Sequence, residues 1–325
     1  RIADKPIWSP AYITISDLFR RHSDLKVADP IKSICDLHKV FVACTGIDET
    51  LDHFYGWGQL LLADFDDVDK NMVDAKLLFA NLSDIHELDD VSYLTDYQKA
   101  MIKKFFSNFS DDHNTELKKR FLQLWSHFYD IYVGFNQKLA EQQLAYEGAL
   151  YRKVVNDEDI DFHYKKYLFI GFNMMQIVEQ TLCDRLLKQG KALFYWDYDK
   201  YYMEGQNEAG HYIRQYLKHY PNELASYPQK DIYDNMSKNK DITYISAPTE
   251  NIQARYVNAW LKEHNRYKMG RNVAIVLSDE NLLQSVIHSL PEEVKSVNIT
   301  IGYPLQQTPF YSLIQQLIQL QGTGH

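Results

Sequence analysis

Several features are scarce or missing in this 325-residue chain, and each scarcity excludes a class of protein. The three cysteines, Cys35, Cys44 and Cys183, show no CxxC spacing. They predict free thiols in a reducing cytosol rather than a disulfide framework or a zinc site. No apolar run of about 18 residues and no signal peptide is present, so we expect no membrane span. Because the chain opens at Arg1 rather than methionine, we expect it to be a piece of a longer product.

A basic excess is also missing, since the net charge is −9. Affinity for nucleic acid comes largely from neutralising phosphates. The chain is therefore expected to contact DNA or RNA only through local patches, or beside a partner that supplies most of the cations. Glycine (13) and proline (9) are few and aromatic residues reach 14%, a profile typical of long helices with aromatic packing rather than of disorder or a fibrous repeat.

Catalytic and phosphate-binding motifs are absent from the sequence: GxxxxGK[ST], GxGxxG, HExxH and GxSxG do not occur. The acidic run DFDDVD at 64–69 does not fit a calcium loop, because Asp69 and Ala75 stand where Gly and Glu are required. Asp67 and Asp74 lie seven apart on one predicted helical face, opposite the apolar stripe, which indicates a solvated surface and no metal site.

One short match to a nuclease pattern remains weak. Asp279, Glu293 and Lys295 follow the order D…ExK, in which two acids bind a divalent ion and the lysine orients water. That chemistry needs the ExK on a strand, whereas Pro291 before it predicts a turn. A chance match is the favoured interpretation.

The first half of the chain has the periodicity of helices. Residues 28–46 begin with Asp29 as an N-cap and Pro30 in the first turn, and they end at Gly46. Apolar residues then recur at three- and four-residue steps over 50–82 and 116–151. We expect residues 30–150 to form an all-helical module.

The second half alternates short apolar runs with helical stretches. The runs lie at 167–171, 192–197, 242–247, 272–278 and 297–302, and helices are expected at 173–188, 208–219, 250–263, 280–289 and from Thr308-Pro309 onward. This alternation predicts βαβ units and an α/β fold with parallel sheets. Residues 220–240, with two prolines and many polar residues, are the expected linker.

Several phrases of the sequence resemble a known family. They are Trp57-Gly58 with DFDDVDK to Lys70, AYEG at 145–148 through Arg152, FIGFN at 169–173, FYWDYD at 194–199 and GYPLQQTP at 302–309. These phrases resemble the helicase-like N-terminal region of bacterial PD-(D/E)XK nuclease family proteins, relatives of the AddB/RexB subunit. The order of the segments is similar to that of UvrD-type superfamily 1 helicases.

The resemblance implies two RecA-like parallel-sheet pieces, 1–29 plus 151–235 and 240–325, with 30–150 inserted as a helical domain. Where an active motor of this type holds the Asp-Glu pair that binds magnesium, this chain holds Gly171 and Phe172, followed by Asn173. A neutral pair cannot anchor magnesium or polarise the attacking water. We therefore expect an inert fragment without a cofactor, with any phosphate loop before Arg1 and any nuclease residues after His325.

The implied function is to bind or guide DNA, single-stranded and weakly when alone, toward a nuclease. The implied partners are a nuclease domain of the same polypeptide and a motor helicase subunit of a DNA repair or recombination complex. Backbone contact needs basic side chains. The candidates are Lys103, Lys104, Lys118, Lys119, Arg120, Arg266, Lys268 and Arg271. Solvated helix ends or loops are the alternative for each cluster, and the acidic net charge favours that alternative.

Two other functions stay open. A protein-interaction scaffold would bind no single-stranded DNA even at low salt, and a nucleotide-binding enzyme of another type would be stabilised by nucleotide. At the end of the second run, Asp197 and Asp199 alternate with Trp196 and Tyr198 at the edge where open α/β sheets bind ligands. With no third acid nearby, packing and capping are the expected roles of the two carboxylates.

Overall fold

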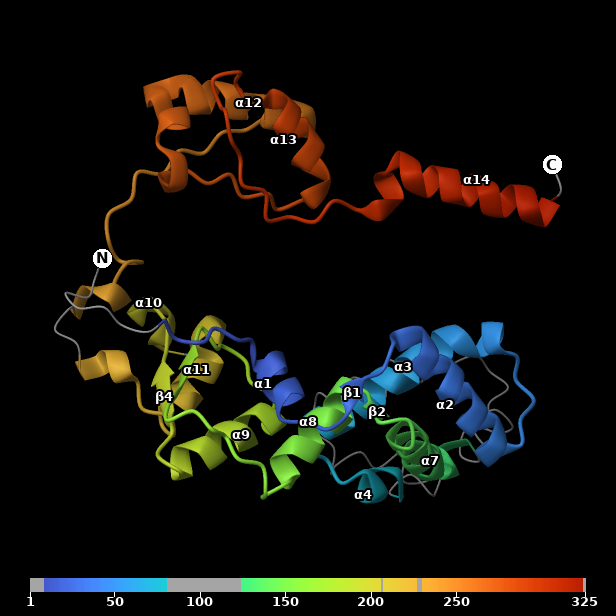
Figure 1. The fold of residues 1–325 in the computed structure, drawn as a ribbon. Helices are drawn as coiled ribbons and strands as arrows, with labels where there is room; N and C mark the ends of the chain where they lie inside the picture. Colours follow the sequence, from blue (N-terminus) through green and yellow to red (C-terminus); the bar gives the residue numbers. More distant parts are fainter. Residues whose placement is uncertain (1–8, 81–123, 206, 227–229, 324–325) are drawn as a thin grey trace. The chain divides into compact units, whose positions relative to one another are not determined.

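The computed structural model describes residues 9–80, 124–205, 207–226 and 230–323. The chain divides into two compact units, Arg1–Lys238 and Asn239–His325 (Figure 1). Helices dominate both, and the described residues contain two parallel sheets of two strands each. The predicted α/β fold with two RecA-like parallel-sheet pieces is therefore wrong. The division into three domains stays a prediction.

One part of the first unit is a helical core. It contains α2 (Pro30–Thr45), α3 (Leu51–Lys70), α4 (Ala75–Ala80) and α7 (Phe128–Ala140). As predicted, the Asp29 side chain accepts the Lys32 N–H at 3.0 Å, and Gly46 ends α2 in a left-handed conformation. The predicted aromatic packing lies between these helices, with Phe41, Phe54, Phe65 and Phe135 in the core. Aromatic spacing thus predicted packing correctly.

The long helices predicted over 50–82 and 116–151 are interrupted. The first ends at Lys70, where Met72 takes a positive φ of 55°, and α4 starts at Ala75. The second ends at Ala140, before β2 (Leu144–Ala145) and α8 (Glu147–Asn156). β2 pairs in parallel with β1 (Lys26–Val27), a sheet too short to show in the sequence pattern.

The other part of the first unit surrounds two parallel strands, β3 (Tyr167–Ile170) and β4 (Ala192–Tyr195), paired from Tyr167↔Ala192 to Ile170↔Tyr195. Both strands and their parallel pairing follow the sequence prediction. Helices α1 (Ile15–Arg21), α8, α9 (Ile177–Lys188) and α11 (His211–Tyr216) contribute to the same core. Trp196 is buried there, and its Nε1 donates to the Tyr220 carbonyl at 3.2 Å.

The β3–β4 sheet has apolar side chains on both faces, but the described residues cover one face with a hydrophobic core. Tyr167 and Phe169 are buried, whereas Leu168 and Ile170 on the other face are 51% and 65% exposed. A parallel sheet of the doubly wound type needs helices on both faces. Within the described residues, the core lies on the side of Tyr167 and Phe169 alone. The apolar run therefore predicted a strand correctly and a complete sheet wrongly.

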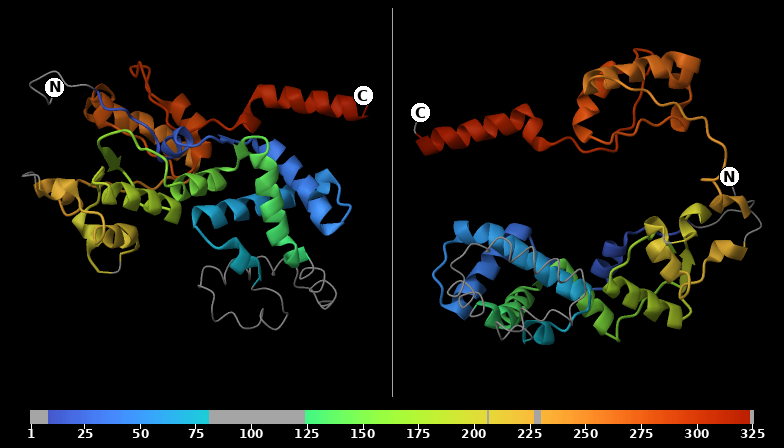
Figure 2. Two further views of the ribbon diagram at one scale, coloured as in Figure 1. Left: turned by 60° about the horizontal axis from the view of Figure 1, so that its bottom comes forward. Right: turned by 180° about the vertical axis from the view of Figure 1, so that it is seen from behind.

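The second unit is organised by α12 (Glu250–Lys262) and α13 (Leu283–Ser289), and α14 (Pro309–Thr323) projects from them (Figure 2). The helices predicted at 250–263 and from Pro309 are confirmed. The strands predicted at 242–247, 272–278 and 297–302 are wrong, because these segments are extended but unpaired. Tyr244 and Val276 are 90% and 87% exposed. α12 and α13 are the packed helices in this unit, so these runs lack the second layer that a buried strand requires.

Candidate binding site at the carboxyl ends of the paired strands

A pocket with a volume of about 420 Å³ lies at the carboxyl ends of β3 and β4 in the first unit. We call it the carboxyl-edge pocket. Its apolar lining comes from three aromatic and three aliphatic side chains: Phe172, Tyr198, Tyr202, Met203, Ile213 and Ile232. Its polar lining comes from Asn173, Asp197, Asp199 and Asn235. Ligand pockets in proteins combine these two kinds of lining, and this volume suits a small molecule.

Asp199 holds one wall of the pocket in place. Its Oδ1 accepts the Tyr201 N–H at 3.0 Å and caps α10 (Lys200–Met203). Its Oδ2 accepts the backbone N–H groups of Asn235 and Met236 at 2.7 and 2.9 Å. The capping role expected for this acid is therefore confirmed, and the carboxylate also ties a later loop to the end of β4.

Two further side chains hold backbone at or next to the pocket. Arg214 on α11 donates to the Tyr202 carbonyl at 3.0 Å and to the Asn207 carbonyl at 2.8 Å. The Tyr216 hydroxyl accepts the Met175 N–H at 2.9 Å. Because such bonds hold the surrounding loops, the pocket is largely preorganised.

The polar groups at the mouth differ from those in the walls. Asn173 and Asp197 are exposed, and neither side chain hydrogen-bonds to another described residue. No Lys or Arg is among the described lining residues.

Gly171 and Phe172, the neutral pair singled out in the sequence, also line the pocket. The described residues contain no group of three or more His, Cys, Asp or Glu side chains placed to hold a metal ion. The site therefore offers hydrogen-bond acceptors and ring surfaces rather than positive charge.

The basic candidates from the sequence are not among the described residues that line this pocket. Five of them, Lys103, Lys104, Lys118, Lys119 and Arg120, lie outside the described residues. The other three belong to the second unit.

Among those three, Arg266 is engaged: its Nη1 donates to Glu263 Oε2 at 2.7 Å, and its guanidinium lies 4.8 Å from the Trp260 ring centroid. Lys268 lies 5.5 Å from the Tyr267 ring centroid, and Arg271 is exposed. Asp279, Glu293 and Lys295 from the D…ExK match are in this unit as well, and Glu293 forms an ion pair with Lys262 at 3.6 Å.

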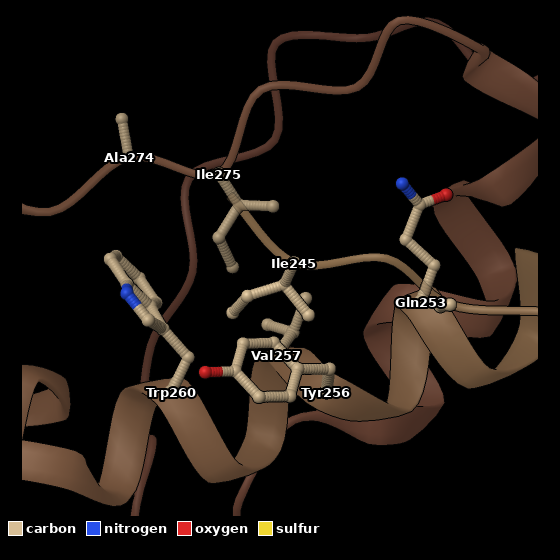
Figure 3. A pocket seen from close by; sticks show the side chains of 8 residues that line it. Ile245, Gln253, Tyr256, Val257, Trp260, Ala274 and Ile275 are labelled. Atoms are coloured by element: carbon tan, nitrogen blue, oxygen red, sulfur yellow. The ribbon is translucent and has the colours of Figure 1, made fainter. Parts of the chain in front are cut away.

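A smaller pocket of about 280 Å³ in the second unit has a different character. Ile245 and Ile275, from two of the extended segments, lie over Tyr256, Val257 and Trp260 of α12 (Figure 3). Apart from Gln253, the lining side chains described are aliphatic or aromatic. This space is an incompletely filled apolar core, so the carboxyl-edge pocket is the better candidate for recognition.

Sequence reasoning missed a buried polar cluster between α3 and α8. Asp69 is 1% exposed and accepts hydrogen bonds from the hydroxyls of Tyr132 (2.6 Å) and Tyr146 and from Arg152 Nη1 (3.1 Å). Asp67 and Asp74, the pair predicted to lie on a solvated face, are exposed, whereas Asp69 of the same acidic run is buried. The sequence carried one clue to this cluster. The segments DFDDVDK and AYEGALYR, which both occur in the family resemblance, contact each other in the structure.

The same interface carries a second set of charges. Lys70 forms ion pairs with Asp66 at 2.7 Å and with Glu147 at 3.2 Å, and Arg20 reaches Glu147 at 2.8 Å. Burial acts to lower the pKa of Lys70, but the two carboxylates outweigh it and raise that pKa. The Gly148 N–H donates to Asp66 Oδ1 at 2.6 Å, and a Cβ at this position would lie 2.5 Å from the Asp66 carbonyl oxygen. These groups hold the helical core against the core around β3 and β4, which we call the strand-bearing core.

Comparison with known proteins gives no match to a family model, to a curated protein or to a solved structure. Among the described helices, none is long and apolar enough to cross a bilayer.

Proposed function

We propose that this chain is a non-catalytic, cytoplasmic part of a DNA repair or recombination helicase–nuclease that holds single-stranded DNA for a nuclease domain outside it. The observation that carries the proposal is the chemistry of the carboxyl-edge pocket. Gly171, Phe172 and Asn173 follow the first paired strand, where a nucleotide-driven motor needs carboxylates for magnesium. The pocket keeps aromatic and amide groups, which suit bases rather than phosphates.

The resemblance of FYWDYD and GYPLQQTP to the helicase-like region of PD-(D/E)XK nuclease proteins supports the DNA context. FYWDYD supplies four of the pocket-forming or pocket-supporting residues, from Trp196 to Asp199. Cofactors are not required for this role. A nuclease domain of the same polypeptide and a motor helicase subunit are the partners proposed for it.

Binding of a fluorescent oligonucleotide of about 20 nucleotides, longer than the roughly 4–16 nucleotides of a single-strand site, tests the proposal. We expect a dissociation constant on the order of 1–100 µM and a loss of roughly 10-fold or more between about 50 and 200 mM salt. We expect no ATP hydrolysis and no stabilisation by ATP. Appreciable ATP turnover, or no DNA binding at the lower salt, would contradict it.

A protein-interaction scaffold is the second candidate, and α14 is the observation that favours it. Its apolar residues recur at helical spacing and are exposed: Phe310, Leu313, Ile314, Leu317, Ile318 and Leu320. Such a stripe is typical of a helix that packs on another protein surface. Concentration-dependent association that Leu317→Glu abolishes, together with no DNA binding at low salt, would favour this candidate over the first.

A further inference from the structure

We propose that the carboxyl-edge pocket binds a nucleobase that carries an exocyclic amino group. The chemistry of the ligand follows from the lining of the pocket. Its identification as a nucleobase rests on the proposed function.

The walls of the pocket suit a flat ring. Phe172, Tyr198 and Tyr202 contribute aromatic surface, and Met203, Ile213 and Ile232 contribute aliphatic surface. Tyr198 is held by stacking on Tyr233, with ring centroids 4.4 Å apart and an interplanar angle of 14°. Every base has a π-face, so stacking on such side chains is tolerant of sequence. The cavity of about 420 Å³ is at the small end of ligand pockets, which suits one base or nucleoside.

The mouth of the pocket suits hydrogen-bond donors and disfavours phosphate. As a carboxylate, Asp197 accepts hydrogen bonds only. The exocyclic amino groups of cytosine, adenine and guanine are donors, whereas the corresponding group of thymine is a carbonyl acceptor. Asn173 offers both a donor and an acceptor beside it. Because no Lys or Arg is among the described lining residues, a phosphate placed inside would face Asp197 and Asp199 without a counter-charge.

The source of the base is either a single strand with one base unstacked into the pocket or a free nucleoside. Asp199 and Arg214 hold lining segments through hydrogen bonds to backbone groups, and Tyr216 holds Met175 next to them, so the pocket does not have to form around its ligand. A strand would leave its phosphates outside the mouth, where the acidic side chains of the pocket do not enclose them.

The test uses the full chain and two sets of probes. Free cytidine and thymidine are titrated by calorimetry, and oligo(dC) and oligo(dT) of equal length are titrated by fluorescence anisotropy. We expect cytidine to bind at least about 5-fold more tightly than thymidine, the lower bound for one good base contact. Asp197→Asn replaces an acceptor-only group with one that also donates, so the preference falls to near unity. Asp67→Asn, a substitution at an exposed position on α3, leaves the preference unchanged.

The outcomes separate this inference from the proposed function. Oligonucleotide binding that is unaffected by Asp197→Asn and Asn173→Ala, with no cytidine binding, overturns the inference and leaves the proposed function standing. Cytidine binding with the predicted preference, but no oligonucleotide binding, supports the pocket's specificity for a free nucleoside and overturns the proposed function. A preference for cytidine over thymidine and for oligo(dC) over oligo(dT), removed in both cases by Asp197→Asn, supports base recognition in the pocket. It also supports binding of single-stranded DNA at the same site.

Discussion

At the scale of single residues, neighbouring acids of the run DFDDVD have opposite environments. Asp69 is buried and accepts three hydrogen bonds, whereas Asp67, two positions earlier, is exposed. Asp69→Asn removes the charge that pairs with Arg152 and leaves that guanidinium without compensation. We expect the free energy of unfolding, measured with urea, to fall by roughly 2–4 kcal/mol.

Asp67→Asn is the matched control for that measurement, because it makes the same chemical change on the same helix. Its effect on the free energy of unfolding should stay within about 0.5 kcal/mol, as for most surface substitutions. Equal effects of the two substitutions would show that the cluster around Asp69 contributes nothing to stability.

A second buried carboxylate gives a prediction about pH. Burial acts to raise the pKa of Asp36, but hydrogen bonds from Lys32 Nζ (2.7 Å) and Gln142 Nε2 (3.2 Å) and the charge of Lys39 outweigh it and lower that pKa. A carboxylate whose pKa is lower in the folded state stabilises the fold above its unfolded pKa of about 3.9. That stabilisation is lost as the pH falls through the lowered pKa.

Asp36→Asn removes this contribution. The variant should be less stable than the parent at pH 6, and the gap between their urea midpoints should close as the pH is taken below about 4. A gap that is constant over this range would mean that ionisation of Asp36 does not stabilise the fold.

At the scale of elements, the contact between α3 and α8 depends on the absence of a side chain at one position. A Cβ added at Gly148 would lie 2.5 Å from the Asp66 carbonyl oxygen, which is backbone and cannot yield cheaply. Gly148→Ala should therefore cost about 1–3 kcal/mol of stability through overpacking. Gly56→Ala, on α3 with nothing within 4 Å of the new Cβ, should instead stabilise by about 0.5–1 kcal/mol. Thermal unfolding of the two variants, expected to shift in opposite directions, checks the prediction.

Local patterns predicted the elements better than their assembly. The caps at Asp29 and Gly46 defined α2 because capping is a local property of the backbone. The runs at 167–171 and 192–197 formed strands because each has a partner and a covering core. The run at 272–278 is also apolar but has no second layer, and layer formation depends on residues far away in the chain.

The candidate site was only partly predictable for the same reason. The sequence singled out Gly171 to Asn173 and Asp197 to Asp199, and the parallel pairing of β3 and β4 brings them to one edge. It gave no indication of Met203, Ile213, Ile232 or Asn235, which enter through tertiary contacts. The burial of Asp69 could not be read from the sequence because its two tyrosine partners come from segments at least 63 residues away.

At the scale of the whole molecule, the first unit contains two hydrophobic cores built from its own residues, which predicts that it folds without the second. A chain of residues 1–238 should keep the urea midpoint of its cooperative transition, with a change in the free energy of unfolding within about 0.5 kcal/mol. Circular dichroism of the short and full chains checks this. Loss of cooperative unfolding in the short chain would show that the first unit depends on residues 239–325.

The separation of the molecule into distinct cores has an optical consequence. Trp57 and Trp125 belong to the helical core, Trp196 to the strand-bearing core and Trp260 to the second unit. Each core thus contains its own intrinsic fluorophore. Phenylalanine replacements at chosen tryptophans would make the emission spectrum report on one core at a time. Trp196, next to Asp197, would then act as a built-in sensor of what enters the adjoining pocket.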